Sequence, residues 1–125
     1  MPLSEDIVTN RYRFTGYTQT SVSVNEIEYS TNLILSPDDL IQPWNASSVG
    51  ALQYQDFDAV LALNPEVVLL GTGEHQIFPE PAIFGLFGER RIGLEVMNNG
   101  ALCRTFNILV AEDRAVVAAL FLDKG

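Results

Sequence analysis

Short alternating patterns dominate the first part of the chain. Between residues 11 and 25 the large apolar side chains recur at alternating positions, with Gly16 interrupting the series: Tyr12, Phe14, Val22 and Val24. Alternation with a period of two is typical of half-buried β-strands, because successive side chains point to opposite faces. This segment therefore predicts two strands.

The next residues predict an antiparallel N-terminal section. Asn25–Glu26 can turn the chain between a strand at residues 21–24 and another at 27–29. Residues 32–35 form a further short apolar run, and residues 36–39 have turn chemistry. The stretch from Pro43 to Gly50 then reads as a long loop.

The pattern changes to helical spacing after this loop. Apolar residues return at intervals typical of a helix between residues 54 and 63, and Asn64–Pro65 ends that helix. Residues 66–70 then form a strand candidate in which Glu66 is followed by an unbroken run of β-branched and aliphatic side chains. Such a run is typical of a strand buried on both faces, so this strand is expected to be central and parallel to a neighbour.

The last third predicts a second helix at residues 79–87 and a strand at 93–97. The segment 98–111 allows two interpretations, because Asn99–Gly100 is a strong hairpin signal. As a helix, the same segment gains a cap from Asn98 or Asn99 and one apolar stripe, made by Leu102, Phe106, Leu109 and Val110. We adopt the helix, and residues 114–122 then form the closing strand.

Composition limits the function classes. The 125 residues are 47% hydrophobic, which is enough for one domain over residues 1–125 with its own core. The net charge of −9 repels polyanions on average. We therefore expect no nucleic acid among the partners.

Two features bear on the compartment. Cys103 is the single cysteine, and one free thiol fits a reducing compartment. Residues 1–6 lack the basic and apolar regions of an export signal, and no apolar run approaches the roughly 20 residues that cross a bilayer. We expect a cytoplasmic protein without membrane insertion.

Several spaced motifs are similar to those of a known family. They are the run Leu69–Gly73, the Phe78–Pro79 pair, the run 93–109, Arg114, and Ala118–Leu120. In this order they resemble the Mth-domain family, which includes a mitochondrial complex I assembly factor, an adipogenesis-associated Mth-domain protein and many uncharacterised bacterial proteins. This sequence resembles a bacterial member.

The resemblance implies a three-layer α/β fold with a mixed central sheet, and it supports the helix at residues 98–111. It implies no reaction, because the family offers no catalytic residues to carry over. Its best-described member acts by association with other proteins. The resemblance therefore favours an interaction domain over an enzyme.

The turn after the central strand is the first candidate site. Gly71, Thr72 and Gly73 are typical of a turn whose backbone N–H groups approach an anion, although Gln76 stands where a dinucleotide fingerprint needs glycine. The alternative is a tight turn. His75 could act as a base near neutral pH, but it lacks a second histidine or any metal-binding spacing, so a simple loop residue is the other interpretation.

Cys103 and Arg104 complete this candidate pocket. In the helical interpretation Cys103 lies in the first turn, where the helix dipole and the Arg104 charge favour a thiolate. The alternative is an inert thiol packed beside Leu102 and Phe106. We expect the inert thiol.

A second candidate site is an interface for a protein partner. Its residues lie in two segments punctuated by glycine and proline, where the backbone can project side chains outward: Trp44, Phe84, Leu86 and Phe87 as apolar anchors, with Arg90 and Arg91 as a polar rim. Core packing of the aromatic residues and solvation of the arginines are the alternatives.

The leading hypothesis is an uncharacterised non-enzymatic interaction or assembly-factor-like domain that binds a protein partner or a second copy. It requires no cofactor and no metal. The alternative is a domain that binds a small molecule or anion, or a minor enzyme, using the turn at residues 71–73 together with Cys103.

Overall fold

The computed structural model describes residues 11–123. The expectation for residues 1–6 lies outside this range, and the expected domain over residues 1–125 extends past both of its ends.

The chain begins with a small antiparallel sheet. Its three strands are β1 (Phe14–Tyr17), β2 (Val22–Val24) and β3 (Ile27–Tyr29), in that order. The turn between β2 and β3 is made by Asn25 and Glu26, whose φ angles are 48° and 72°. Two left-handed residues give a tight turn whose twist matches that of the strands. The predicted antiparallel section is confirmed.

A second, mixed sheet has five strands in the order β5, β4, β8, β6, β7. They are β5 (Leu40–Ile41), β4 (Leu33–Leu35), β8 (Val116–Leu120), β6 (Val67–Gly71) and β7 (Gly93–Met97). Strand β6 is parallel to β8 and to β7, whereas β4 is antiparallel to β8 and β5. Every residue of β6 is buried, as expected for the central apolar run.

The helices differ from the predicted bounds in small ways. The helix expected at 54–63 is a 3-10 turn at Tyr54–Phe57 followed by the short helix α2 (Asp58–Leu61). Helix α3 (Pro81–Glu89) begins two residues after the expected Pro79, with Pro81 in its first turn. The loop expected from Pro43 to Gly50 runs into a 3-10 turn at Val49–Ala51.

The segment 98–111 is a helix, α4 (Asn99–Ala111). Its N-cap is Asn98, whose side-chain oxygen accepts a hydrogen bond from the Ala101 N–H at 2.8 Å. The buried residues Leu102 and Phe106 lie on its inner face. The hairpin interpretation is therefore wrong, because burial of this stripe needs a period near 3.6.

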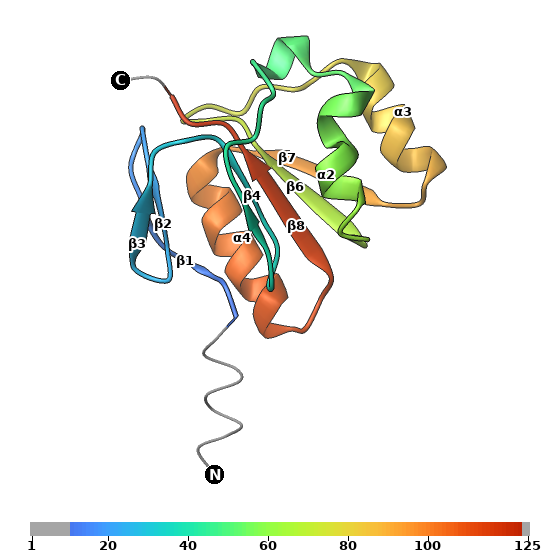
Figure 1. Cartoon of the computed structure of the whole chain (residues 1–125). Coiled ribbons are helices and arrows are strands. Elements are labelled where there is room, and N and C mark those ends of the chain that lie inside the picture. Colours follow the sequence, from blue (N-terminus) through green and yellow to red (C-terminus); the bar gives the residue numbers. More distant parts are fainter. Residues whose placement is uncertain (1–10, 124–125) are drawn as a thin grey trace.

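The elements form three layers, as the family resemblance implies. Helices α2 and α3 lie on one side of the five-stranded sheet, while α4 and the three-stranded sheet lie on the other (Figure 1). One apolar core fills each side, with Phe57, Ile83 and Phe87 in the first and Phe14, Leu102 and Phe106 in the second. Within residues 11–123 no helix is long and apolar enough to cross a membrane.

Candidate functional site

The ends of the parallel strands meet at one edge of the sheet. The chain passes from β6 through α3 to the outer strand β7, and from β7 through α4 back to β8 on the other side of β6. The two helices cover opposite faces of the sheet (Figure 1). In open α/β sheets this reversal of strand order is the usual position of a ligand site. The turn after β6 lies at this edge.

Within the turn, Thr72 is a structural residue. It is 5% exposed, and its hydroxyl donates to the His75 carbonyl at 2.6 Å and accepts from the Ile77 N–H at 3.1 Å. Gly73 adopts a φ of 93°, which a residue with a side chain rarely adopts. The turn is therefore held by its own hydrogen bonds.

Asn99 fastens this turn to the neighbouring strand end. Its side-chain oxygen accepts from the Gly73 N–H at 3.2 Å, and its side-chain nitrogen donates to the Phe121 carbonyl at 2.7 Å. The Asn99 backbone N–H also donates to the Gly73 carbonyl at 2.8 Å. Asn99 is 5% exposed, so these are buried bonds that join the start of α4 to the ends of β6 and β8.

The glycines at this edge make room for side chains of the same molecule. A Cβ atom on Gly71 would overlap the Asn99 amide, one on Gly73 would lie 2.6 Å from Asp123 Oδ1, and one on Gly100 would lie 2.6 Å from Tyr17 Oη. Because the Gly73 N–H already donates to Asn99, it has no free position for an anion. Internal packing therefore explains the glycine pattern.

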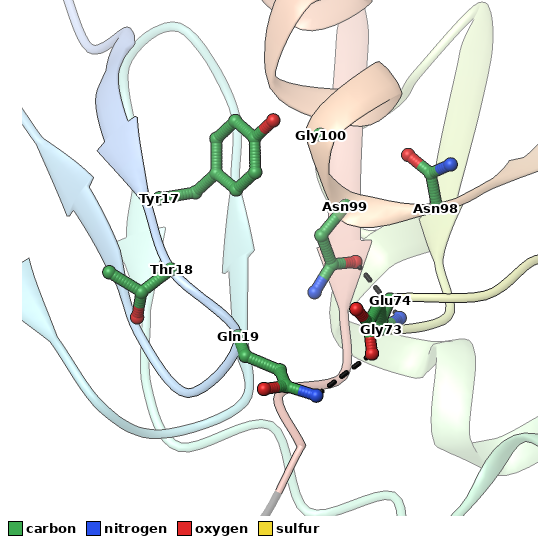
Figure 2. Close-up of a pocket in the computed structure, with 8 residues that line it drawn as sticks. All are labelled: Tyr17, Thr18, Gln19, Gly73, Glu74, Asn98, Asn99 and Gly100. Carbon is green, nitrogen blue, oxygen red and sulfur yellow. Dashed lines mark hydrogen bonds between the residues drawn. The ribbon is translucent and has the colours of Figure 1, made fainter.

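A small open pocket of about 320 Å³ remains beside these residues. Figure 2 shows the Tyr17 hydroxyl turned toward Gly100, and the Gln19 amide bonded to Glu74 across the pocket at 2.8 Å. The lining residues are Tyr17, Thr18, Gln19, Gly73, Glu74, Asn98, Asn99 and Gly100. Among them the charged side chain is acidic, so the pocket disfavours anions.

The structure does not assemble the predicted pocket as expected. Gly73 lines the cavity, while Gly71 and Thr72 are buried in the strand end and turn. The His75 side chain is 84% exposed, with Nε2 3.8 Å from Glu74 Oε1. Arg104 is exposed and lies outside the lining. The sequence did not predict that Tyr17, Gln19 and Asn99 line this pocket, because these residues come from segments that are distant in sequence.

Cys103 belongs to the core and not to this pocket. It is the fifth residue of α4, beyond the first turn, and it is 6% exposed within the cluster that contains Phe106. Burial raises the pKa of the Cys103 thiol to about 12, although the Arg104 charge acts in the opposite direction. The thiolate interpretation is wrong, since desolvation outweighs the charge.

The predicted interface divides into buried and exposed residues. Trp44 is 5% exposed, and its indole N–H donates to the Asp56 carbonyl at 2.8 Å. Phe87 is 1% exposed and packs edge-on against Phe57, with ring centroids 5.0 Å apart. The prediction that Trp44 and Phe87 are exposed anchors is wrong, because each of them packs against an aromatic partner in the core. Leu86 is half-buried against that core.

The remaining candidates for the predicted interface are exposed on the outer face and at the end of α3. Phe84 is 37% exposed, and Arg90 and Arg91 are exposed at the end of the helix. Four residues at helical spacing share this face, which we call the α3 face: Pro81, Phe84, Gly85 and Gly88. A Cβ atom at Gly85 or Gly88 would meet nothing within 4 Å, so the fold itself does not require these glycines.

Two exposed apolar residues just before α3 were not predicted. Ile77 is 50% exposed and Phe78 is 64% exposed. The adjacent signal was Pro79, which is buried and fixes the backbone on the way into the helix.

The fold and these sites define a small mixed α/β domain with an acidic pocket at the strand ends and an exposed apolar helix face. Among the described residues no group of three or more histidine, cysteine or acidic side chains is placed to hold a metal ion. The chain belongs to the family described as "Protein of unknown function (DUF498/DUF598)", whose model matches residues 14–121.

Two relatives illustrate the range of the family. The "13 kDa major membrane protein" of Francisella tularensis subsp. holarctica is 30% identical over 117 residues, covering 93% of this chain and 95% of the relative. The bovine "NADH dehydrogenase [ubiquinone] 1 alpha subcomplex assembly factor 3" is 32% identical over 93 residues, covering 73% of this chain. The match spans 50% of that assembly factor.

Solved structures show the same fold. An NMR structure of a Xanthomonas campestris protein superposes with a TM-score of 0.84 at 42% identity, covering 98% of this chain and 92% of the other. An NMR structure of a Bordetella pertussis protein, described as a Mth938-like domain, superposes with a TM-score of 0.76 at 25% identity, covering 90% and 86%. The resemblance to the Mth-domain family is confirmed.

Proposed function

We propose that this chain is a non-enzymatic protein-binding domain that uses the α3 face to contact its partners. The relationship to an assembly factor supports association as the mode of action. The single observation that carries the proposal is an exposed aromatic residue, Phe84, that shares its helix face with two glycines, Gly85 and Gly88, which nothing in the fold requires.

The sequence of α3 is locally unfavourable for a helix. A glycine inside a helix is less favourable than alanine by about 0.5–1 kcal/mol, and two such residues stand on one face. Arg91 adds to this cost, because it has a φ of 59° where glycine is usual at a helix end. Residues that oppose local preference without internal compensation are expected at functional surfaces.

A photoreactive phenylalanine analogue at Phe84 tests this proposal in cells. The matched control carries the analogue at Ile108, which is 57% exposed on α4, away from the α3 face. We expect discrete protein adducts from position 84 and none of these from position 108. Equal adduct patterns at the two positions, or no adducts from position 84, would contradict the proposal.

The compartment is part of the proposal. We place the chain in the cytoplasm on its single cysteine, because one free thiol fits a reducing compartment. The Francisella relative is named a membrane protein, so fractionation of cells should compare the soluble and membrane pools. Recovery mainly with the membranes would contradict a cytoplasmic location.

The second candidate function is binding of a small molecule at the strand-end pocket. The observation in its favour is the pocket of about 320 Å³ at the reversal of strand order. Its acidic Glu74 favours a neutral or cationic ligand over a phosphate. Amide chemical shifts of Gln19 and Glu74 that respond to inorganic phosphate would contradict this charge preference.

A further inference from the structure

The α3 face is complementary to itself. Its larger residues, Pro81 and Phe84, occupy the N-terminal half of the face, and its glycines, Gly85 and Gly88, occupy the C-terminal half. When two such helices cross in opposite directions about an axis between Phe84 and Gly85, each large residue lies opposite a glycine. Phe84 of one copy then packs over Gly85 of the other, and Pro81 packs over Gly88.

The charges at the two ends of the helix fit the same arrangement. Glu80 precedes the first residue of α3, and Arg90 and Arg91 follow its last residue, Glu89. The C-terminal end therefore has an excess of positive charge and the N-terminal end is negative. Among the described residues neither arginine belongs to a salt bridge.

The relative direction of the two α3 helices decides which charges lie close to each other. In the antiparallel register Glu80 of one copy lies level with Glu89 of the other, and Arg90 and Arg91, the next residues along the chain, give that end its net positive charge. Parallel helices would place arginines against arginines and Phe84 against Phe84, which opposes like charges and leaves the glycines without an occupant. Closed two-fold dimers are the commonest homo-oligomers, and they require a self-complementary surface of this kind.

We propose that the α3 face binds a second copy of this chain, with the two α3 helices antiparallel across a two-fold axis between Phe84 and Gly85. The inference rests on the proposed protein-binding function and names the partner. Helix α3 has nine residues and is about 13 Å long, so its face alone falls short of the roughly 800 Å² per partner of a standard interface. A weak dimer in equilibrium with monomer follows.

Engineered cysteines test the partner and its direction together. In a Cys103→Ala background, Pro81→Cys and Gly88→Cys are prepared separately, and circular dichroism checks that both remain folded. Residues 81 and 88 are seven apart, about 10 Å along one helix, so antiparallel helices pair 81 with 88 and separate like positions. We expect a disulfide-linked dimer when the two variants are mixed and oxidised, and little from either alone.

Parallel helices would give the reverse result, with each variant linking to itself, and would overturn the proposal. Failure of every combination to link above the level of a Cys103→Ala protein with Ile108→Cys would also overturn it. Because Ile108 is exposed on α4, that protein measures random collision between surface thiols.

Sedimentation equilibrium of the unmodified chain gives an independent measurement. We expect a concentration-dependent mass that rises from 13.8 kDa toward twice that value. Arg90→Glu with Arg91→Glu should weaken the dimer at least tenfold, whereas Arg104→Glu, an exposed arginine on α4, should leave it unchanged. A monomer at concentrations up to about 1 mM would overturn the inference. If photo-adducts at Phe84 then contain another protein, the proposed function stands without self-association.

Discussion

Gly71 lies directly against the side-chain amide of Asn99, so close that a Cβ atom on Gly71 would overlap the amide oxygen. The same Cβ would lie 2.9 Å from Leu102 Cδ1 and 3.0 Å from Leu120 Cβ. These neighbours belong to α4 and β8, which flank β6. The close approach therefore sets how tightly the helix and the two strands pack at the candidate edge.

Gly71→Ala is expected to destabilise the protein by about 1–3 kcal/mol, because the added methyl group displaces a hydrogen-bonded amide and two core side chains. The free energy of unfolding in urea measures the effect. Gly50→Ala is the control, since its Cβ meets nothing within 4 Å. Equal stability of the two variants would contradict the packing at Gly71.

Asn99→Asp is expected to destabilise the protein by about 1–3 kcal/mol, because a carboxylate cannot donate to the Phe121 carbonyl and repels it instead. Asn98→Asp supplies a matched control of the same chemistry one residue away. Asn98 caps α4 by accepting from Ala101, and aspartate caps equally well. Urea unfolding measures the free energy of unfolding of both variants. A similar small decrease in each would contradict the stabilising role of the buried Asn99 hydrogen bonds.

Much of the fold could be predicted because its elements have clear periods. Residues 67–71 are apolar throughout and form the buried centre of the sheet, and Asn25–Glu26 turns the chain as expected. The choice between helix and hairpin at residues 98–111 depended on the apolar stripe through Leu102 and Phe106, which the structure buries.

The candidate sites were harder to predict, because burial depends on what packs against an element. Helix α3 offers Ile83, Phe84 and Phe87, and spacing alone does not say which of them face the sheet. The core takes Ile83 and Phe87 and leaves Phe84 in solvent. Asn99 was expected as a possible cap, but its bonds reach Gly73 and Phe121, which are distant in sequence.

The native Cys103 thiol is expected to react with a labelling reagent about a thousandfold more slowly than a free thiol near pH 8. Burial raises its pKa from 9.0 to about 12, and three pH units reduce the thiolate fraction about a thousandfold. The same label applied in urea supplies the unfolded rate. Similar rates in the native and unfolded protein would contradict the buried thiol.

The raised pKa of Cys103 also predicts the direction of an alkaline effect. Because the folded pKa lies above the ordinary value, the stability from the neutral thiol is present below pH 9.0 and is lost as the pH rises toward 12. Cys103→Ala should therefore lose less stability than the native protein over this range. Parallel losses in urea unfolding series at several alkaline pH values would show that the thiol makes no contribution.

Gly85→Ala is expected to strengthen the fold and to weaken self-association. Alanine is favoured over glycine inside a helix by about 0.5–1 kcal/mol, and its Cβ has open space at this position. In the proposed dimer the same methyl group stands where Phe84 of the second copy packs, so the dimer should weaken. Urea unfolding at a concentration where the protein is monomeric measures the first effect, and sedimentation equilibrium at high concentration measures the second.

Gly100→Ala is the contrasting control, because its Cβ would meet Tyr17 Oη at 2.6 Å and should destabilise the fold. A Gly85→Ala protein that unfolds more easily than the native one would contradict the open face, and one that dimerises as strongly would contradict the antiparallel contact.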